Sequence, residues 1–299
     1  MPKTNRDREA AELLLENARD FLSGGVDLLF RQGATPSDAK IAVVSIQTAV
    51  ELFAKYRIVQ ELGFAQIIRK GNVPRGGNLL VSAKQGHFST LGYDACLEKV
   101  AELEWLGDWQ RELIGELQRM RNTLVHFAGE LDVEDTRRAV SALLVQVLAL
   151  FAAGRARDEP EMSDHRQFLS QGSFDALTSH PEYLVEAFDA ASGDPDADAI
   201  FTCWLCERET LTLRPAGAYF CWTCGLGAES GVAGFGPCWQ CGEKDKVCFD
   251  RLNDDDGAHY GRCLQCGSTA FIGNCRSCGE LRSAPDVGLL RDCACAQEG

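Results

Sequence analysis

The sequence is poor in long apolar runs and in positive charge, and it has almost no cysteine before residue 200. Its most apolar stretch, residues 139–153, contains Ser141 and Gln146 and is too short to span a bilayer. Residues 1–15 are charged from the third position and lack an uninterrupted apolar core, so we expect no signal peptide. These absences predict a soluble protein of the cytoplasm with no membrane partner.

Basic residues are outnumbered, with 30 Lys+Arg against 44 Asp+Glu and a formal net charge of -14. This balance argues against a basic protein that binds nucleic acids broadly. Residues 159–202 are the most acidic part, where Arg166 is the single basic residue among ten acidic ones. Solubility is the simpler explanation of that acidity, and partner binding is the alternative.

At 299 residues the chain is long for a single core, and its composition divides it into three parts. We expect a helical bundle over 1–158, an acidic helical segment and linker over 159–202, and tandem zinc ribbons over 203–299. The predicted fold class is an all-α, up-and-down helical bundle followed by small zinc-ribbon β modules.

Apolar periodicity in the first part predicts a series of helices. Asp108 and Asp132 stand at N-cap positions, and Pro36 suits a first helical turn. The Gly-rich loop at 71–78 lacks the Gly-Lys-Ser/Thr ending of a phosphate-binding loop, so we expect no nucleotide site there. The predicted helices cover 6–22, 37–62, 89–105, 108–127 and 133–154.

Cysteine is concentrated at the other end of the chain: Cys96 is followed by thirteen cysteines from Cys203 onward. In a reducing cytoplasm, clustered Cys-x-x-Cys pairs (knuckles) indicate metal binding more often than disulfides. Twelve thiolates make about three closed, four-cysteine sites of the structural zinc type. The predicted ligands are Cys203, Cys206, Cys221, Cys224, Cys238, Cys241, Cys263, Cys266, Cys275, Cys278, Cys293 and Cys295.

Pairing the knuckles in chain order leaves fourteen, twenty-one and fourteen residues between partners. The first gap, 207–220, contains two short β-type runs around a Pro-Ala-Gly turn, which predicts the hairpin of a zinc ribbon. The alternative pairing joins the knuckle at 263–266 with the knuckle at 275–278. Cys96 and Cys248 are not assigned to a zinc site, and we expect them to be structural or incidental thiols.

The residues around the knuckles have predicted roles of their own. Glycine follows four of the five knuckles and permits the positive φ of the turn. With every ligand from the protein, no water position remains, so we expect no catalysis at these ions. Trp204, Trp222 and Trp239 lie inside knuckles, either as stacking surfaces for bases or a partner, or as covers for small ribbon cores.

The fourth predicted helix, 108–127, has two distinct faces at 100° per residue. Asn122 and His126 are four residues apart and therefore neighbours, while Arg121 lies on the flank between the faces. The core stripe is formed by Leu113, Leu117, Met120, Leu124 and Phe127. The opposite face carries Arg111, Gly115, Gln118, Asn122 and His126.

Arg121-Asn122 followed by three residues and His126 resembles the Arg-x4-6-His motif of the HEPN superfamily (higher eukaryotes and prokaryotes nucleotide-binding). The helical setting over roughly residues 1–155 agrees with that resemblance. It implies a bundle of four or five helices that forms a homodimer with the motif helices facing each other, where Gly115 and Gln118 fit close packing. Members with this motif are commonly metal-independent endoribonucleases, often toxins or phage-defence effectors.

The implied chemistry uses the 2′-OH of RNA as the nucleophile. His126 serves as general acid or base, Arg121 binds phosphate oxygens, and Asn122 orients the phosphate or the imidazole. The expected product is a 2′,3′-cyclic phosphate, with no cofactor in catalysis and no cleavage of DNA.

Two other functions remain open: a non-catalytic interaction module, and a zinc-ribbon nucleic-acid binder whose bundle only dimerises it. The acidity ranks the second of these last. Three four-thiolate zinc sites would bring the net charge to about -20, so we expect a selective RNA substrate. An antitoxin or another defence protein is a further expected partner.

Overall fold

The computed structural model describes residues 4–69, 79–85, 89–103, 107–127, 132–156, 164–228, 233–251, 257–275 and 278–290. The chain forms two compact units. The helical unit comprises Met1–Phe151 and Arg166–Tyr183. The ribbon unit comprises Ala152–His165 and Leu184–Gly299.

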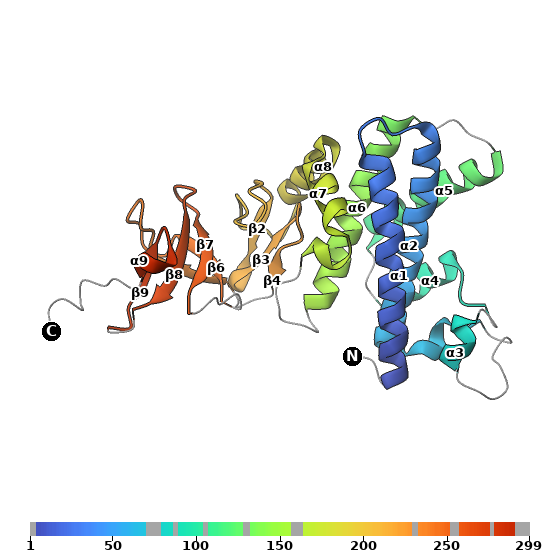
Figure 1. Ribbon diagram of the computed structural model, residues 1–299, viewed down its shortest axis with the longest axis horizontal. Coiled ribbons are helices and arrows are strands. Elements are labelled where there is room, and N and C mark those ends of the chain that lie inside the picture. The colour runs from blue at the N-terminus through green and yellow to red at the C-terminus, as the bar shows by residue number, and fades with distance from the viewer. Residues whose placement is uncertain are drawn as a thin grey trace. The chain divides into compact units, whose positions relative to one another are not determined.

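Figure 1 shows the helices and strands in chain order. The longer helices are α1 (Asn5–Phe30), α2 (Pro36–Leu62), α4 (Tyr93–Glu102), α5 (Asp108–Phe127), α6 (Val133–Ala156), α7 (Gln171–Ser179) and α8 (Pro181–Ser192). Shorter elements are α3 (Leu79–Lys84), α9 (Val287–Leu290) and the 3-10 turns η1 (Phe64–Ile67), η2 (His165–Gln167) and η3 (Pro215–Gly217). The prediction of a helix-rich N-terminal part followed by small β modules is confirmed at this level.

The hairpin of α1 and α2 is the centre of the helical unit. Pro36 occupies the first turn of α2, as predicted, and Thr35 and Asp38 form a capping box. The expected end of α1 near residue 22 is wrong, since the helix continues to Phe30. A Cβ on Gly25 would lie 2.7 Å from Ile46 Cγ1, so glycine inside α1 permits close approach of α2 rather than ending the helix.

The later helices agree with the sequence more closely. The ranges of α5 and α6 match the predicted 108–127 and 133–154 helices, and Asp132 Oδ1 accepts the Asp135 N–H at 2.9 Å as an N-cap. The predicted helix at 89–105 is shorter in the structure, because Thr90 pairs with Ile68 in an isolated bridge before α4 begins. The loop at 71–78 and the side chain of Asp108 lie outside the described residues.

Apolar side chains hold the helical unit together. Leu22, Val26 and Ile46 are fully buried, and each such side chain contributes about 1.5–3 kcal/mol relative to exposure. The α1 C-terminus is held by Arg137 of α6, whose guanidinium donates to Leu29 O at 2.8 Å and to Arg31 O at 3.0 Å. Buried apolar side chains and this contact between helices therefore both stabilise the helical unit.

The ribbon unit contains two antiparallel sheets. The first has the order β1 (Ala199–Phe201), β2 (Leu211–Arg214), β3 (Ala218–Cys221), β4 (Gly227–Ala228). The second has the order β5 (Ala233–Gly236), β6 (Val247–Asp250), β7 (His259–Cys263), β8 (Thr269–Asn274), β9 (Leu281–Ala284). The β2–β3 hairpin, with η3 at its turn, confirms the hairpin predicted for 207–220.

The apolar core of the second sheet is small. Val247, Phe249 and Ile272 pack with Ala270 around the buried thiols of two knuckles. A core of this size gives little stability on its own.

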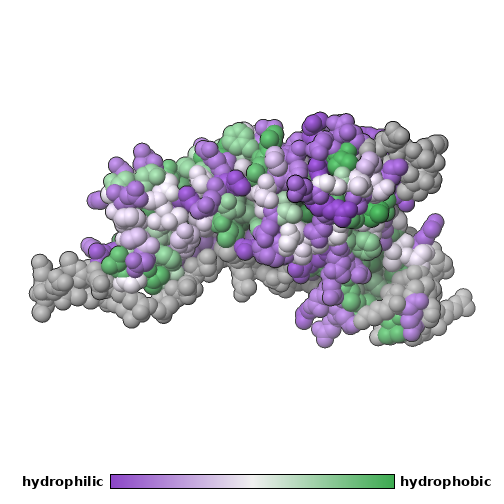
Figure 2. Space-filling model, turned by 45° about the horizontal axis from the view of Figure 1, so that its top comes forward, coloured by the Kyte–Doolittle hydropathy of each residue, from purple (hydrophilic) through white to green (hydrophobic). Residues whose placement is uncertain are grey.

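The surface is mixed rather than uniformly polar. Figure 2 shows hydrophobic patches among hydrophilic residues on the face in view. Phe21, Ile41 and Val44 of the α1–α2 hairpin are among the large apolar side chains that are exposed. Within the described residues, no helix has both the length and the apolarity needed to cross a membrane.

Candidate metal centres and the motif helix

All five knuckles share the same pair of backbone hydrogen bonds. In each, the N–H of the first cysteine donates to the carbonyl five residues on, and the N–H four residues on donates back to the first cysteine's carbonyl, at 2.7–3.1 Å. The fourth position after the first cysteine has φ between +60° and +76°. It is glycine in four knuckles, as predicted, and Glu207 in the first. These turns aim two thiols to the same side.

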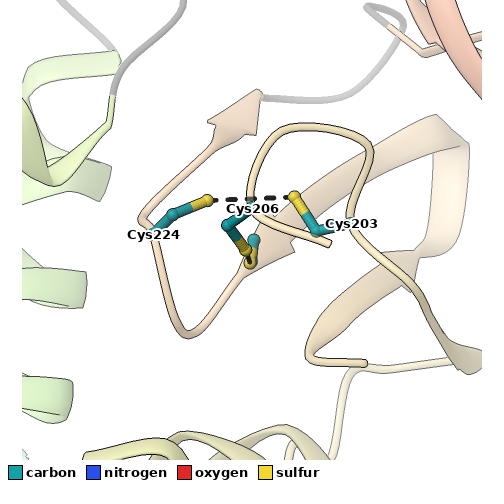
Figure 3. Close-up of side chains that lie close together, drawn as sticks. Cys203, Cys206 and Cys224 are labelled. Atoms are coloured by element: carbon teal, nitrogen blue, oxygen red, sulfur yellow. Dashed lines mark hydrogen bonds between the residues drawn. The ribbon is translucent and has the colours of Figure 1, made fainter. Parts of the chain in front are cut away.

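The first cluster joins the knuckles that follow β1 and β3. The ligand atoms of Cys203, Cys206, Cys221 and Cys224 all lie within 4.8 Å of one another. Cys203 Sγ is 3.8 Å from Cys224 Sγ, and Cys206 Sγ is 3.6 Å from Cys221 Sγ. Figure 3 shows Cys203, Cys206 and Cys224 pointing inward to a common centre. Cys206 is partly exposed and the other three thiols are buried.

Neighbouring polar groups brace this first cluster. Thr210 Oγ1 lies 3.3 Å from Cys221 Sγ and 2.8 Å from Thr223 Oγ1, and all three residues are buried. Leu205 N donates to Cys203 Sγ at 3.3 Å. Hydrogen bonds to sulfur of this kind orient ligands and stabilise thiolates.

His165 packs against the second knuckle of the same cluster, a contact that the cysteine pattern did not predict. Its backbone N–H donates to Cys224 O at 2.8 Å. Its ring lies so close to Gly225 that a Cβ there would be 2.1 Å from His165 Cδ2. Burial lowers the pKa of His165 to about 4, so the ring is neutral near pH 7. Cysteine spacing cannot reveal such a residue, because His165 lies far ahead of the knuckles in the chain.

The second cluster joins the third and fourth knuckles, Cys238/Cys241 and Cys263/Cys266, again with ligand atoms within 4.8 Å of one another. Cys238 Sγ is 3.7 Å from Cys266 Sγ, and Cys241 Sγ is 3.8 Å from Cys263 Sγ. Ser268 Oγ lies 3.3 Å from Cys238 Sγ and 3.1 Å from Cys266 Sγ. Cys238 and Cys263 are buried, whereas Cys241 and Cys266 are exposed.

Crowding of thiols in this second cluster favours a bound cation. Although desolvation opposes it, hydrogen bonds from the Cys241 N–H and from Ser268 lower the pKa of Cys238 to about 6. Despite a hydrogen bond from the backbone of Glu243, desolvation and the neighbouring thiols raise the pKa of Cys241 to about 12. Ionisation of one thiol thus disfavours ionisation of the neighbouring thiol. A divalent cation at the centre reverses this, and four sulfurs are a donor set that suits a soft-binding metal ion.

The knuckles are therefore joined in chain order, first with second and third with fourth. The alternative pairing of 263–266 with 275–278 does not occur. Cys275 is buried and Cys278 exposed, while their predicted partners Cys293 and Cys295 lie outside the described residues.

The two remaining cysteines are buried away from the clusters. Desolvation raises the pKa of both Cys96 and Cys248 to about 12, which keeps these thiols protonated and unreactive. They are thiols of the protein interior.

The tryptophans of the knuckles differ in exposure. Trp204 makes an edge contact with Tyr219 at 5.1 Å between ring centroids, and Trp222 makes one with Phe220 at 5.3 Å. Trp239 is 44% exposed, with Nε1 donating to Thr269 O at 3.0 Å. Trp204 and Trp222 thus pack within the first ribbon, and Trp239 presents a surface to solvent.

The motif helix α5 carries Arg121, Asn122 and His126 in one continuous stretch. Arg121 Nη1 donates to Asn122 Oδ1 at 2.9 Å. Gln118 Nε2 donates to Asp94 Oδ1 of α4 at 2.7 Å. The side chain of His126 lies outside the described residues.

The predicted faces of α5 can be checked over part of its length. Leu113 and Leu117 are buried, as the core stripe requires, and Ile114 is buried beside them. Among the described residues, a Cβ on Gly115 would meet no atom within 4 Å, so this point of the opposite face is open toward the described part of the chain. The side chains of Leu124 and Phe127 lie outside the described residues, with His126.

Comparisons with protein-family models, curated proteins and solved structures gave no match. Function therefore has to be inferred from the residues themselves. Two features offer that basis: the pair of four-cysteine clusters and the motif on α5.

Proposed function

We propose that the chain is a zinc protein in which zinc holds the ribbons in their fold. The support is the donor set: two groups of four cysteines, each converging from two knuckles with the same pair of backbone hydrogen bonds. All-thiolate tetrahedral coordination is typical of structural zinc, and it leaves no position for a reacting water.

A third zinc ion completes this proposal. The knuckle at Cys275 and Cys278 has the same two backbone hydrogen bonds as the clustered knuckles, at 2.8 Å each, and Gly279 has a φ of +73°. Cys293 and Cys295 are its proposed partners. Elemental analysis of purified protein tests the set: we expect three zinc ions per chain, falling to two in Cys275→Ser.

We further propose that the helical unit is a metal-independent endoribonuclease. The observation that carries this proposal is the arrangement on α5, where Asn122 and His126 are one turn apart and the Arg121 guanidinium is hydrogen-bonded to the Asn122 side chain. A cationic side chain and a titratable imidazole on the same helix are the minimum equipment for cleaving RNA through its own 2′-OH.

In the proposed reaction, His126 transfers a proton to or from the 2′-hydroxyl or the leaving 5′-oxygen. Arg121 binds the non-bridging phosphate oxygens and stabilises the charge that develops on them. Asn122 limits the rotamers of Arg121 and so orients it. The products are a 2′,3′-cyclic phosphate and a 5′-hydroxyl, and a DNA strand is not cut because it lacks the nucleophile.

A homodimer through α5 belongs to the same proposal. Glycine inside a helix costs about 1 kcal/mol relative to alanine, and no contact that the structure describes around Gly115 requires glycine there. Close approach of a second copy gives that glycine a use. Two motifs would then line one RNA-binding cleft.

The acidity of the chain defines the substrate further. A net charge of -14 before metal binding disfavours RNA that is held only through its phosphates. We therefore propose a selected RNA, recognised partly by the ribbons, and a role as a toxin or phage-defence effector in the cytoplasm, with an antitoxin or another defence protein as partner. Exposed Trp239 is a candidate stacking surface for a base or for that partner.

The nuclease proposal is tested by incubating purified wild-type protein with total RNA without added metal. His126→Ala is expected to lower the cleavage rate by at least about 100-fold, the usual contribution of a general acid or base. The cleavage rate of Arg121→Ala should fall similarly. Arg119→Ala removes an exposed arginine from the same helix and should cleave like the wild type.

The outcomes distinguish a wrong activity from a wrong assignment of the catalytic residue. Absence of RNA cleavage by the wild type, in cells and in vitro, would reject the nuclease and favour a non-catalytic interaction module. Equal cleavage by wild type and His126→Ala would reject only the assignment of that residue.

A further inference from the structure

The two cysteine clusters have the same ligands but different exposure. In the first, Cys203, Cys221 and Cys224 have no exposed surface, and His165 covers one side. In the second, Cys241 and Cys266 are exposed while their knuckle partners are buried. A reagent in solution can therefore reach two sulfurs of the second cluster directly.

We infer that the second cluster is an oxidation site, at which hydrogen peroxide converts Cys241 and Cys266 to a disulfide and releases the metal. This inference rests on the proposed zinc occupancy. Reactivity of cysteine follows thiolate character and access, and zinc-bound sulfur in both clusters is thiolate. Access is what differs between them.

The contacts in the second cluster favour Cys241 as the first residue attacked. Ser268 Oγ lies 3.1 Å from Cys266 Sγ, and a hydroxyl donor to a thiolate lowers its nucleophilicity. Cys241 Sγ lies 3.8 Å from Cys263 Sγ and faces solvent. The sulfur of Cys266 is within 4.8 Å of that of Cys241, so it can complete the reaction.

The electron balance is complete with peroxide as the oxidant. The Cys241 thiolate attacks one oxygen of peroxide, the O–O bond breaks, hydroxide leaves and a sulfenic acid forms. The Cys266 thiolate then attacks that sulfur, the S–S bond forms, the S–O bond breaks and a second hydroxide leaves. The two sulfurs lose two electrons to peroxide, and zinc, left with Cys238 and Cys263 alone, dissociates.

Release of this ion has a local structural consequence. Cys238 and Cys263 belong to the small core with Val247 and Ile272, so the second sheet loses part of its support. The first cluster, in which three thiols are buried and Cys206 is only partly exposed, should keep its metal. Peroxide would thus change one ribbon and leave the other folded.

The test uses the full-length zinc-loaded protein and limiting hydrogen peroxide. Zinc release is followed with a colorimetric chelator, and each cysteine is followed by isotope-coded alkylation and peptide mass spectrometry. We expect Cys241 and Cys266 to be lost at least about tenfold faster than Cys203, Cys221 and Cys224, with a disulfide joining the first two. Peptide mapping separates this event from any reaction at exposed Cys278.

A second measurement asks whether the oxidation can be reversed. Dithiothreitol and added zinc should restore the original zinc content, because a disulfide is reducible and a sulfinic acid is not. Equal oxidation of both clusters, or faster oxidation of the first, would overturn the inference while leaving the zinc sites intact. Protein that contains no zinc before peroxide is added would instead reject the proposed function.

Discussion

The helical unit and the ribbon unit reach a stable fold by different means. In the helical unit, long helices bury whole faces, and side chains such as Leu22, Val26 and Ile46 have no exposed surface or almost none. In the ribbon unit, strands of two to six residues surround small cores into which the thiols themselves are packed. Removing the proposed zinc should therefore unfold the ribbon unit and leave the helical unit folded.

The largest expected effect is that of metal removal. A strong chelator should unfold both ribbons, because binding of structural zinc supplies most of their folding free energy. The helices should persist, since no cysteine cluster lies among the described residues of the helical unit. Hydrogen exchange measured by mass spectrometry checks this: protection should disappear from β1–β9 and remain in α1 and α2. Simultaneous loss of protection in α2 would contradict it.

Single ligand substitutions should have the next largest effect. Cys221→Ser removes a buried ligand and should lower the zinc content by one ion, with loss of the first ribbon's structure. Cys248→Ser is the matched control, since Cys248 is as buried as Cys221 and lies outside the clusters. It should keep its full zinc content. Elemental analysis of both variants distinguishes a metal effect from the effect of a buried hydroxyl.

A smaller effect is expected at the buried pair of Tyr219 and Asp250. The Tyr219 hydroxyl donates to Asp250 Oδ2 at 2.5 Å and joins β3 of the first sheet to β6 of the second. Tyr219→Phe leaves that carboxylate without one of its donors and should cost about 1–3 kcal/mol. Denaturant unfolding of zinc-loaded protein measures it, and an unchanged midpoint for the ribbon transition would count against the role of this pair.

The smallest effect belongs to the helical unit. Thr35 caps α2 by accepting the Asp38 N–H, so Thr35→Ala should lower the unfolding free energy of this unit by about 1 kcal/mol. Thr48→Ala, at a partly exposed threonine in the middle of α2, is the control and should change this free energy little. Thermal unfolding followed at a helical wavelength compares the two variants.

The capping box also makes the stability of the helical unit depend on pH. Hydrogen bonds from the Thr35 backbone and side chain, with help from Arg31, lower the pKa of Asp38 to about 2. A carboxyl group with a lowered pKa in the folded state stabilises the fold above its unfolded pKa near 4. That stabilisation should disappear as the pH falls from about 4 to about 2.

Parts of the structure with local causes were predictable from the sequence. The N-cap at Asp132, the turn of β2–β3 and the positive φ after four knuckles depend only on neighbouring residues. The chain-order pairing of the first four knuckles followed from the same spacing. In each of these features, the residues that interact are close together in the sequence.

Features that depend on distant contacts were not predictable. The extension of α1 past Gly25 follows from its contact with Ile46, and the shortening of α4 follows from the bridge between Ile68 and Thr90. The position of His165 against Gly225 follows from how the chain folds back onto the ribbon. Periodicity and spacing contain no information about such approaches.

The most direct test of the account is native mass spectrometry of the full chain, because it counts bound ions and the copies of the chain together. We expect zinc at both described clusters and a third zinc at the Cys275 knuckle. We also expect the loss of one ion in Cys221→Ser and the loss of a different one in Cys241→Ser. A chain that contains no metal while its ribbons remain protected from hydrogen exchange would contradict the account.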